Sequence, residues 1–331
     1  MNYAESPDIQ KKIEEASTIL LNCHHMPDAD SVGSALAMYQ LLTHMGKKVR
    51  IVCPSTLPQN FDFLAEVDKI ETVDFSSFDF SSFDLFITLD SGSWNRVTGS
   101  NEIDKPDLPI IVIDHHVSNT RYGTINLIVP EAAANCIIVY FLLQDLGYRV
   151  DREHDYPEFA QPLLTGIIGD TGAFRFPEAD ELTLTIAIEL MKYTSKDKII
   201  FNLYQRFDIR HLELWGEFLS NIHIDEEHKF VWSAVSKEAY KKYGNIVGAK
   251  SELADMLFAN IEGTDFGAIA IEDDECISVS FRSRSGVDVS KLAASLGGGG
   301  HTWASAARIT GMPYNEGVEK ILEACRAFTK K

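Results

Sequence analysis

Three polar residues, Asp114, His115 and His116, follow directly on the apolar run at 110–113. The run predicts a strand that is buried on both faces, as in a parallel sheet. Open α/β sheets place their ligands at the carboxyl ends of such strands. A carboxylate and two imidazoles at this edge therefore predict ligand chemistry, provided that other segments bring matching side chains to the same place.

Carboxylate and imidazole side chains recur beside other apolar segments in the first half of the chain. The further candidates are His24, Asp28, Asp30, Asp90 and Asp170. Oxygen and nitrogen donors of this kind suit a borderline-to-hard divalent cation such as Mn²⁺. They are too many for one ion, so they predict two ions about 3.5–4 Å apart that share one carboxylate and a water.

A pair of divalent cations suits the hydrolysis of phosphoesters. The ions lower the pKa of the shared water and neutralise charge on the phosphoryl oxygens. Each cluster alone also has a structural interpretation: Asp28 and Asp30 as a turn and helix N-cap, Asp90 as a cap, Asp170 as a turn, and the His pair as a hydrogen-bonded polar cluster. Their recurrence in one half of the chain favours a shared metal site.

The segments between these clusters alternate between expected strands and helices. Strands are expected at 18–23, 47–53, 84–89 and 110–114, and helices at 5–18, 31–45, 131–146 and 159–168. This alternation predicts an α/β fold with a largely parallel five- or six-stranded sheet flanked by helices.

After Phe176 the pattern changes to successive helices, and strand-like runs return at 230–235, 266–271 and 276–282, before a final helix at 315–328. We therefore predict three parts. They are a metal-binding catalytic domain (1–185), a helical linker (186–221) and a smaller α+β domain with a mixed sheet that binds substrate (222–331).

The composition restricts the class of partner. A net charge of −19 argues against binding long duplex nucleic acid, which requires a basic surface, and leaves small phosphorylated molecules and short oligonucleotides.

No apolar run is long enough to predict membrane insertion or secretion. Five widely spaced cysteines without a CxxC motif predict free thiols in a reducing cytoplasm. The sequence leaves open whether the protein is a homodimer.

The motifs resemble those of the DHH superfamily of phosphoesterases. The N-terminal motifs are His24-x-x-Pro27-Asp28-x-Asp30, Asp90 after an apolar strand, Asp114-His115-His116, and Asp170-Thr171-Gly172. The C-terminal motifs, Ser280-Phe281-Arg282-Ser283 and Gly298-Gly299-Gly300-His301, are similar to those of the DHH-associated domain. The resemblance spans nearly the whole chain, and the length and short linker are similar to the NrnA-like (nanoRNase/pAp phosphatase) subfamily.

The resemblance implies a role for each residue. The implied metal ligands are His24 and Asp28 for one ion, Asp30, His115 and Asp170 for the other, and Asp90 as the bridge. His116 would contact the scissile phosphate or the nucleophile, and Asp114 would orient a histidine; together with Asp90 they are the expected catalytic residues. The expected cofactors are two Mn²⁺ ions, with Mg²⁺ or Co²⁺ as alternatives.

The resemblance also implies a substrate site in the C-terminal domain, formed by Arg282, Ser283, Arg284, Gly298, Gly299, Gly300 and His301. Glycines let backbone N–H groups approach an anion closely, although a glycine run alone is more often a flexible turn. Two departures from the family affect the shape of the nucleotide pocket. Ala306 stands where the family has Gly, and Ala134-Asn135 where it commonly has Ser-Thr.

The expected function is hydrolysis of short oligoribonucleotides to mononucleotides, and of pAp (3′-phosphoadenosine 5′-phosphate) to AMP, by a hydroxide that bridges the two ions. The linear dinucleotide pApA or a cyclic dinucleotide is an alternative substrate for the same site, and polyphosphate is a less favoured one. A nucleotide-binding sensor without catalysis is the alternative from another class. It would have lost metal ligands, and no ligand position is lost here.

Overall fold

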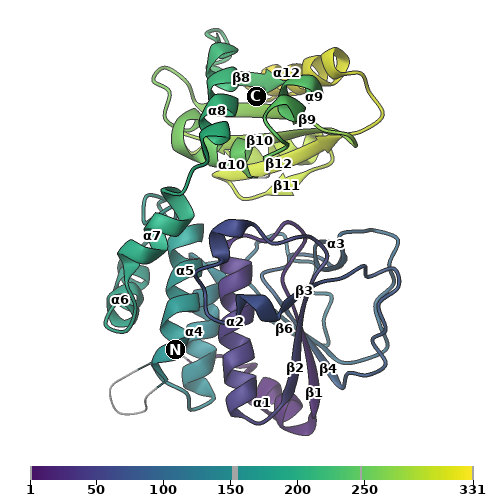
Figure 1. Ribbon diagram of the computed structural model, residues 1–331, viewed down its shortest axis with the longest axis vertical. Coiled ribbons are helices and arrows are strands. Elements are labelled where there is room, and N and C mark those ends of the chain that lie inside the picture. The colour runs from purple at the N-terminus through teal and green to yellow at the C-terminus, as the bar shows by residue number, and fades with distance from the viewer. Residues whose placement is uncertain (1, 151–155, 247, 330–331) are drawn as a thin grey trace. The chain divides into compact units, whose positions relative to one another are not determined.

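The chain folds into two compact units. The computed structural model describes residues 2–150, 156–246 and 248–329, and the units are Met1–Arg206 and Phe207–Lys331 (Figure 1). The division between them falls inside the helical linker expected at 186–221. The three domain boundaries given above stay a prediction.

The first unit is built on a six-stranded parallel sheet, here called sheet A, in the order β3-β2-β1-β4-β5-β6. Its strands are β1 (Thr18–Asn22), β2 (Lys48–Cys53), β3 (Ile70–Thr72), β4 (Leu85–Leu89), β5 (Ile110–Asp114) and β6 (Ile125–Ile128). The largely parallel sheet expected from the sequence is confirmed. The sequence did not single out β3 and β6, which are edge strands of three and four residues and lack a long apolar run.

The strand order gives sheet A a topological switch point. The chain first adds strands on one side of β1, and then returns to add β4, β5 and β6 on the other side. Connections therefore leave β1 and β4 in opposite directions, and a crevice opens beyond their carboxyl ends. This is the edge at which the predicted metal ligands follow their strands.

The helices of the first unit are α1 (Ser6–Glu15), α2 (Ala29–His44), α3 (Trp94–Thr98), α4 (Asn135–Asp145), α5 (Ala160–Asp170), α6 (Glu181–Leu190) and α7 (Lys196–Tyr204), with short 3₁₀ turns at Gln59–Phe61, Val67–Lys69 and Pro157–Phe159. Helices α2, α4 and α5 pack together on one face of sheet A (Figure 1). Glycines permit this close packing, because a Cβ on Gly33 would lie 2.3 Å from the Pro162 carbonyl oxygen.

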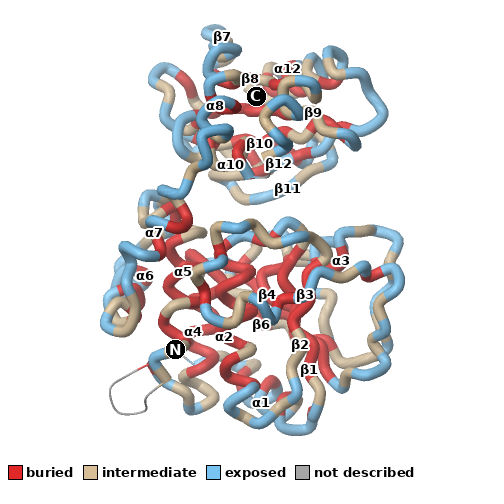
Figure 2. Tube along the Cα trace, viewed as in Figure 1, coloured by how far each residue is buried: buried red, intermediate tan, exposed pale blue. Residues whose placement is uncertain are grey.

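The other face of sheet A is covered mainly by aromatic side chains. Leu20, Val52, Phe86 and Val112 point to this face and pack against Phe75, and the neighbouring Phe78, Phe80 and Phe83 complete the layer. The segment at 74–83, expected to be a loop with apolar anchors, supplies four of these rings. Both faces are thus buried, which explains the continuous apolar runs of β4 and β5 (Figure 2).

The second unit contains sheet B, in the order β11-β12-β10-β9-β8-β7, in which only β8 and β9 pair in parallel. Its strands are β7 (His223–Asp225), β8 (Phe230–Val235), β9 (Phe266–Glu272), β10 (Ile277–Ser283), β11 (Gly299–Gly300) and β12 (Ala304–Ile309). Its helices are α8 (Ile209–Ser220), α9 (Lys237–Lys242), α10 (Ala249–Leu253), α11 (Val289–Ser295) and α12 (Tyr314–Thr329), with a π-helical turn at Ala254–Phe258. The mixed sheet confirms the α+β expectation.

Helices cover the two faces of sheet B unequally. Helices α11 and α12 pack on one face, and α8, α10 and the π-helical turn pack on the other, mostly over β8 and β9. On that second face, Ala306 and Arg308 of β12 are exposed. Among the described residues, no helix has the length and apolar character needed to cross a membrane.

Candidate metal centre

The six predicted metal ligands come together at the carboxyl edge of sheet A. His24 follows β1, Asp28 and Asp30 begin α2, Asp90 follows β4, His115 follows β5, and Asp170 ends α5. They group into two clusters that share Asp90. The switch point between β1 and β4 therefore provides the place that the sequence required.

The first cluster is His24, Asp28 and Asp90. His24 Nε2 lies 3.3 Å from Asp28 Oδ2 and 3.4 Å from Asp90 Oδ2. Donor atoms about 2.1 Å from a divalent cation are roughly 3.0–3.4 Å from one another. The separations in this cluster are of that size.

The second cluster is built around His115. Its Nε2 lies 3.5 Å from Asp90 Oδ1, 3.4 Å from Asp170 Oδ2 and 4.0 Å from Asp30 Oδ2. Asp90 thus turns one carboxylate oxygen toward each cluster, as a bridging ligand must. Asp90 and Asp30 are almost fully buried, whereas the side chains of Asp28 and Asp170 are 56% and 28% exposed. The centre is therefore open to solvent at Asp28 and Asp170.

Backbone carbonyls orient the two imidazoles. Nδ1 of His24 lies 3.0 Å from the His25 carbonyl oxygen, and Nδ1 of His115 lies 3.0 Å from that of Ala132. Nδ1 of His24 also lies 3.2 Å from a guanidinium nitrogen of Arg96, which can only donate, so its two neighbours favour opposite tautomers. At His115 the carbonyl oxygen only accepts, so Nδ1 donates and Nε2 carries the lone pair in the neutral ring. This is the arrangement that metal-binding histidines usually have.

Asp28 serves as helix cap and candidate ligand at once. Its Oδ1 accepts hydrogen bonds from the backbone N–H groups of Asp30 and Ser31, which caps α2. Its other oxygen, Oδ2, faces His24. The helix cap is therefore confirmed, and it uses only one oxygen, so it is compatible with the predicted role of Oδ2 as a metal ligand.

Asp30 fixes the start of α4. Its carboxylate accepts hydrogen bonds from the backbone N–H groups of Asn135 and Cys136, the first two residues of that helix. Ala134, at the N-cap, has no side chain that could do so. The helix was expected to begin at Glu131. It begins at Asn135 instead, where the Asp30 carboxylate accepts hydrogen bonds from its first N–H groups. A charge at the N-terminus of α4 is also favourable to the helix dipole.

Asp90 is held in an uncommon backbone conformation. Its φ is +50°, in the left-handed region, which Asp tolerates better than most residues. Its Oδ1 is buried and, within the described residues, has no hydrogen-bond partner. A buried carboxylate oxygen without a donor is unfavourable, and a cation would satisfy it. The residues present therefore fit a dinuclear metal site.

The carboxylates of the centre favour positive charge, as the pKa shifts of its groups indicate. Burial and Arg96 lower the pKa of His24, but Asp28 and Asp90 outweigh them and raise it to about 9. Burial also lowers the pKa of His115, and Asp170 and Asp90 more than reverse this. Burial and the nearby Asp90 raise the pKa of Asp30 to about 7. The raised pKa values of His24, Asp30 and His115 mean that these groups hold protons more tightly than usual when no cation balances the carboxylates.

Asp114 and His116 form a second layer behind the ligands. His116 Nδ1 lies 2.7 Å from Asp114 Oδ1, and Asp114 also accepts hydrogen bonds from the His115 backbone N–H and from Asn119 Nδ2. Asp114 is fully buried, and His116 is 22% exposed. Asp114 thus orients the His116 ring from a buried position, and His116 is partly exposed to solvent.

Arg96 is a residue that the sequence did not point out. It lies on α3, six residues after Asp90, and one of its guanidinium nitrogens is 3.2 Å from His24 Nδ1. Arg96 is exposed, so a phosphate group could reach it. Arg96 follows the end of β4 closely in sequence, and this position could have identified it as a residue near the metal centre.

The chain that leaves Asp170 is also unusual. Gly172, Ala173 and Phe174 all have φ between +56° and +64°. Two of these are not glycine, and each such residue is disfavoured by about 1–2 kcal/mol. A Cβ on Gly172 would lie 2.8 Å from the Phe176 ring. Backbone strain of this kind often accompanies functional sites, and here it borders a candidate ligand.

In the second unit, Arg282 is paired within the fold. Its guanidinium forms a two-pronged ion pair with the carboxylate of Asp255, which lies in the π-helical turn. Ser283 points to the opposite face of β10, where its hydroxyl is buried and has no hydrogen-bond partner among the described residues. Arg284 is exposed and donates to the Thr264 carbonyl oxygen. The structure thus does not bring these three side chains together.

The glycine run is explained partly by packing. A Cβ on Gly298 would lie 2.1 Å from the Ala306 carbonyl oxygen, and one on Gly300 would lie 2.6 Å from that of Ala304. Gly299, in contrast, faces open space. These glycines let β11 approach β12, and His301 follows directly with its backbone N–H bonded to Ala304. Only Gly299 is thus left without a packing explanation.

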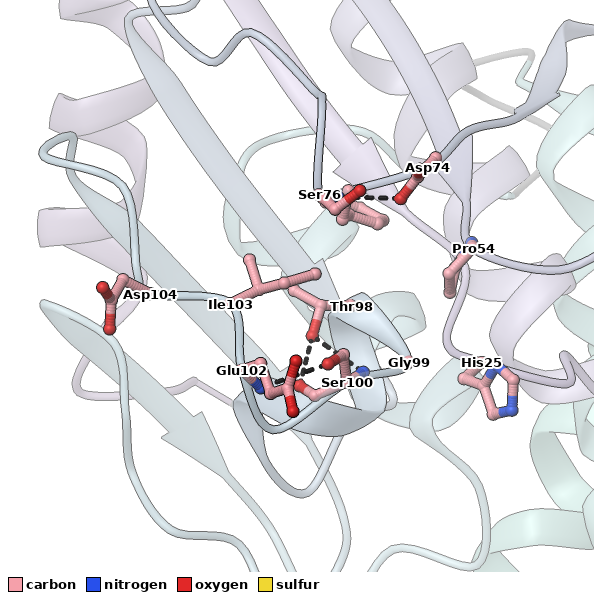
Figure 3. A pocket seen from close by; sticks show the side chains of 11 residues that line it. His25, Pro54, Asp74, Ser76, Thr98, Gly99, Ser100, Glu102, Ile103 and Asp104 are labelled. Carbon is pink, nitrogen blue, oxygen red and sulfur yellow. Dashed lines mark hydrogen bonds between the residues drawn. The ribbon is translucent and has the colours of Figure 1, made fainter.

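A cavity of about 620 Å³ lies elsewhere in the first unit (Figure 3). It is lined by His25, Pro54, Asp74, Phe75, Ser76, Thr98, Gly99, Ser100, Glu102, Ile103 and Asp104. None of the six candidate ligands lines it. Its charged lining residues Asp74, Glu102 and Asp104 are acidic, which disfavours a phosphorylated ligand.

Comparison with known proteins gives matches over most of the chain. The DHH family, N-terminal domain, matches residues 18–167, and the DHHA1 domain matches residues 230–331. The first match contains the clusters at His24–Asp30, Asp90 and Asp114–His116, and the second contains the glycine run.

Individual relatives agree with these matches. A bifunctional oligoribonuclease and PAP phosphatase NrnA from Thermus thermophilus is 29% identical, over 96% of this chain and 92% of the relative. The NrnA protein of Bacillus subtilis is 27% identical, over 91% and 92%. The crystal structure of an exopolyphosphatase-related protein from Bacteroides fragilis superposes with a TM-score of 0.86 at 25% identity, covering 99% and 98% of the two chains. The resemblance to the NrnA-like subfamily is thereby confirmed, and the chain carries a DHH domain and a DHHA1 domain in one polypeptide.

Proposed function

We propose that this protein is a metal-dependent phosphoesterase that hydrolyses short oligoribonucleotides to mononucleotides and pAp to AMP. The observation that carries the proposal is the pair of ligand clusters joined by Asp90, whose two oxygens face His24 and His115 at 3.4 and 3.5 Å. The NrnA relatives, which are named for these two activities, support the choice of substrate.

The proposed metal ligands are His24 and Asp28 for one ion, Asp30, His115 and Asp170 for the other, and Asp90 for both. We propose Mn²⁺, with Mg²⁺ or Co²⁺ as alternatives, because the donors are all carboxylate and imidazole. Two such ions would lower the pKa of a bound water and neutralise charge on the phosphoryl oxygens.

The chain's own residues would hold the substrate in place. The Asp114 carboxylate fixes Nδ1 of His116 as a donor and so orients the imidazole, which would contact a phosphate oxygen or the attacking water. The Arg96 guanidinium, beside His24, offers a further donor to the scissile phosphate. These contacts orient the phosphoester without any large basic surface, in keeping with the net charge of −19.

The second unit would bind the remaining part of the substrate. Arg282, held by Asp255, presents a fixed cation on β10, and Gly299 leaves the adjoining backbone accessible.

We place the protein in the cytoplasm, which is supported by five cysteines that are all buried free thiols.

The test is hydrolysis of a 5′-labelled RNA trinucleotide and of pAp by the purified protein with Mn²⁺. We expect mononucleotides and AMP, and a loss of more than about 100-fold for Asp90→Asn, since even outer-shell partners are worth 10–100-fold. Asp68→Asn, at an exposed position, is the control. Addition of pApA and of polyphosphate as competitors ranks the substrates. Absence of turnover with both RNA and pAp would overturn the proposal.

A further inference from the structure

The Asp90 carboxylate must face two clusters at once, yet no short hydrogen bond holds it in that orientation. The imidazole nitrogens of His24, His115 and His116 lie 3.4, 3.5 and 3.5 Å from its oxygens, which is long for a hydrogen bond. Its Oδ1 has no hydrogen-bond partner among the residues that the structure describes. The orientation of the carboxylate therefore depends on the backbone that carries it.

The backbone of Asp90 needs support from its surroundings. A φ of +50° is disfavoured for a residue with a Cβ, and it persists only where neighbouring groups enforce it. The hydrogen bonds around Leu89 and Ser91, on either side of Asp90, show which groups do so.

Asn22, at the end of β1, ties these two residues together. Its Oδ1 accepts a 3.0 Å hydrogen bond from the Leu89 backbone N–H, and its Nδ2 donates a 3.2 Å bond to Ser91 Oγ. The Ser91 hydroxyl donates in turn to the Leu89 carbonyl oxygen at 2.9 Å. Asn22 and Ser91 are fully buried, so water does not compete for these bonds.

The loop after β5 holds the same segment from the other side. The Ser91 carbonyl oxygen accepts hydrogen bonds from Tyr122 Oη at 3.1 Å and from Asn119 Nδ2 at 3.3 Å. The Thr120 backbone N–H donates to the next carbonyl oxygen, that of Gly92, at 2.9 Å. Asp90 is thus the single residue between two anchored neighbours, and their positions determine its φ and ψ.

Tyr122 delivers its hydroxyl from a packed ring. The ring belongs to the aromatic layer on sheet A, and its centroid is 6.1 Å from that of Trp94. The hydroxyl oxygen also lies 2.8 Å from Thr88 Oγ1 on β4. Asn119 is a less specific support, because its Nδ2 also donates to Asp114. Tyr122 therefore offers the cleaner test of what the Ser91 contact does.

We propose that Tyr122 is a positioning residue of the metal centre, which acts through the Ser91 carbonyl oxygen to hold the backbone of Asp90. The proposal rests on the proposed function in taking Asp90 as the shared ligand, and it names what orients that ligand. Without the hydroxyl, the Ser91 carbonyl oxygen keeps only the longer bond from Asn119. Asp90 can then relax from its left-handed conformation, and any rotation moves both carboxylate oxygens together.

A shared ligand is more sensitive to such a rotation than a ligand of one ion. One orientation of Asp90 must suit both clusters, whereas His24 and His115 each serve one cluster. We therefore expect loss of the Tyr122 hydroxyl to weaken the second step of metal binding more than the first.

The experiment compares Tyr122→Phe with the control Tyr39→Phe. Tyr39 of α2 is also partly buried, and its hydroxyl makes no hydrogen bond within the described part of the chain. Calorimetric titration with Mn²⁺ should show the weaker step reduced about 10–100-fold in Tyr122→Phe, the range for a residue that orients a metal ligand. Tyr39→Phe should bind as the wild type does. Unchanged affinity in Tyr122→Phe, or equal weakening of both steps, would overturn the proposal.

Electron paramagnetic resonance tests the shared ligand directly. Two Mn²⁺ ions joined by a carboxylate are magnetically coupled, and their spectrum differs from that of isolated ions. We expect the coupled spectrum for the wild type and for Tyr39→Phe, and mainly the spectrum of isolated ions for Tyr122→Phe. A coupled spectrum in Tyr122→Phe at the metal affinity of the wild type would count against the positioning role.

Thermal melting separates positioning from stability. The Phe ring keeps the packing of Tyr122, so the Tm in EDTA should fall only slightly, while the rise in Tm on adding Mn²⁺ should be smaller than in the wild type. A lower Tm in EDTA with an unchanged rise would make the role of Tyr122 structural only. Thr88→Val leaves the bond to Ser91 in place and should affect Mn²⁺ binding less; an equal effect would exclude the route through Ser91.

These measurements do not depend on turnover. If the wild type binds a coupled pair of ions that Tyr122→Phe loses, but hydrolyses neither RNA nor pAp, the positioning role stands and the proposed function fails. If the wild type hydrolyses both and Tyr122→Phe binds and couples Mn²⁺ equally well, the proposed function stands and the positioning role fails. A wild type that binds no coupled pair overturns the positioning role whatever its activity.

Discussion

His116 Nδ1 lies 2.7 Å from the buried Oδ1 of Asp114. Since a carboxylate oxygen can only accept, Nδ1 donates, and this hydrogen bond orients the His116 ring.

Replacing Asp114 with Asn should lower kcat for pAp and for RNA about 10–100-fold, the usual effect of losing the partner that orients an active-site histidine. The fold should be kept, because an amide oxygen can still accept from the His115 backbone N–H. Steady-state kinetics and circular dichroism measure the two effects. Wild-type kcat in a folded variant would contradict the role of Asp114.

Metal binding should stabilise the protein strongly, since the carboxylates of the two clusters are close together without a cation. Mn²⁺ at about 100 times its Kd should contribute about 2.7 kcal/mol, or roughly 5–10 °C in Tm. Asp90→Asn should lose most of this increase, and Asp68→Asn should keep it. Differential scanning fluorimetry with Mn²⁺ and with EDTA provides the measurement, and an equal response of both variants would argue against a shared ligand.

Arg96→Gln should raise KM for pAp about 10-fold without weakening Mn²⁺ binding. The guanidinium is 3.2 Å from His24 Nδ1 and repels a cation there, while it attracts phosphate. Arg50→Gln is the matched control, because Arg50 pairs with Glu71 on the surface. Titration calorimetry with Mn²⁺ and substrate kinetics separate the two effects. Weaker Mn²⁺ binding with an unchanged KM would show that Arg96 supports the ligand instead.

Gly166→Ala should destabilise the first unit by about 1–3 kcal/mol, the range for an overpacked core. The added Cβ would lie 2.3 Å from Cys136 Sγ and 2.6 Å from Asp30 Oδ1, so it would also displace a candidate metal ligand. Gly216→Ala in α8 meets nothing within 4 Å and should stabilise its helix by about 0.5–1 kcal/mol. Urea denaturation of both variants checks the opposite signs, and similar values would contradict the packing argument.

Lys250 predicts a pH dependence of stability. Burial, followed by repulsion from Arg282 and Arg308, outweighs the attraction of Asp273 and lowers the pKa of Lys250 from 10.5 to about 7. Between these values the unfolded chain binds more protons than the folded one, so this group makes stability rise as the pH increases. Below about pH 7 Lys250 is protonated in both the folded and the unfolded chain, so the full cost of burying its charge is present. Lys250→Met should thus be more stable than wild type near pH 6, with a difference that narrows by about pH 9.5. Urea denaturation across this range tests the trend, and a constant difference would contradict it.

The sequence by itself determined the strands that carry the site. The apolar runs of β1, β4 and β5 can form only buried strands, and the polar residues that follow them must lie at one edge of a parallel sheet. The motifs predicted a metal-dependent phosphoesterase through their resemblance to the DHH superfamily, and the matches to the DHH and DHHA1 domains confirm that resemblance.

Only the tertiary structure decided how the residues divide their work. Local pattern could not show that Asp28 caps α2 with one oxygen and faces His24 with the other, or that Asp30 begins α4 from 105 residues away. Nor could it show that Arg96 lies beside His24, or that Lys250 donates a hydrogen bond to Ser278. These relationships join segments that are distant in sequence, and they exist because sheet pairing and helix packing bring the segments together. Periodicity describes one element at a time, so it carries no information about which elements become neighbours.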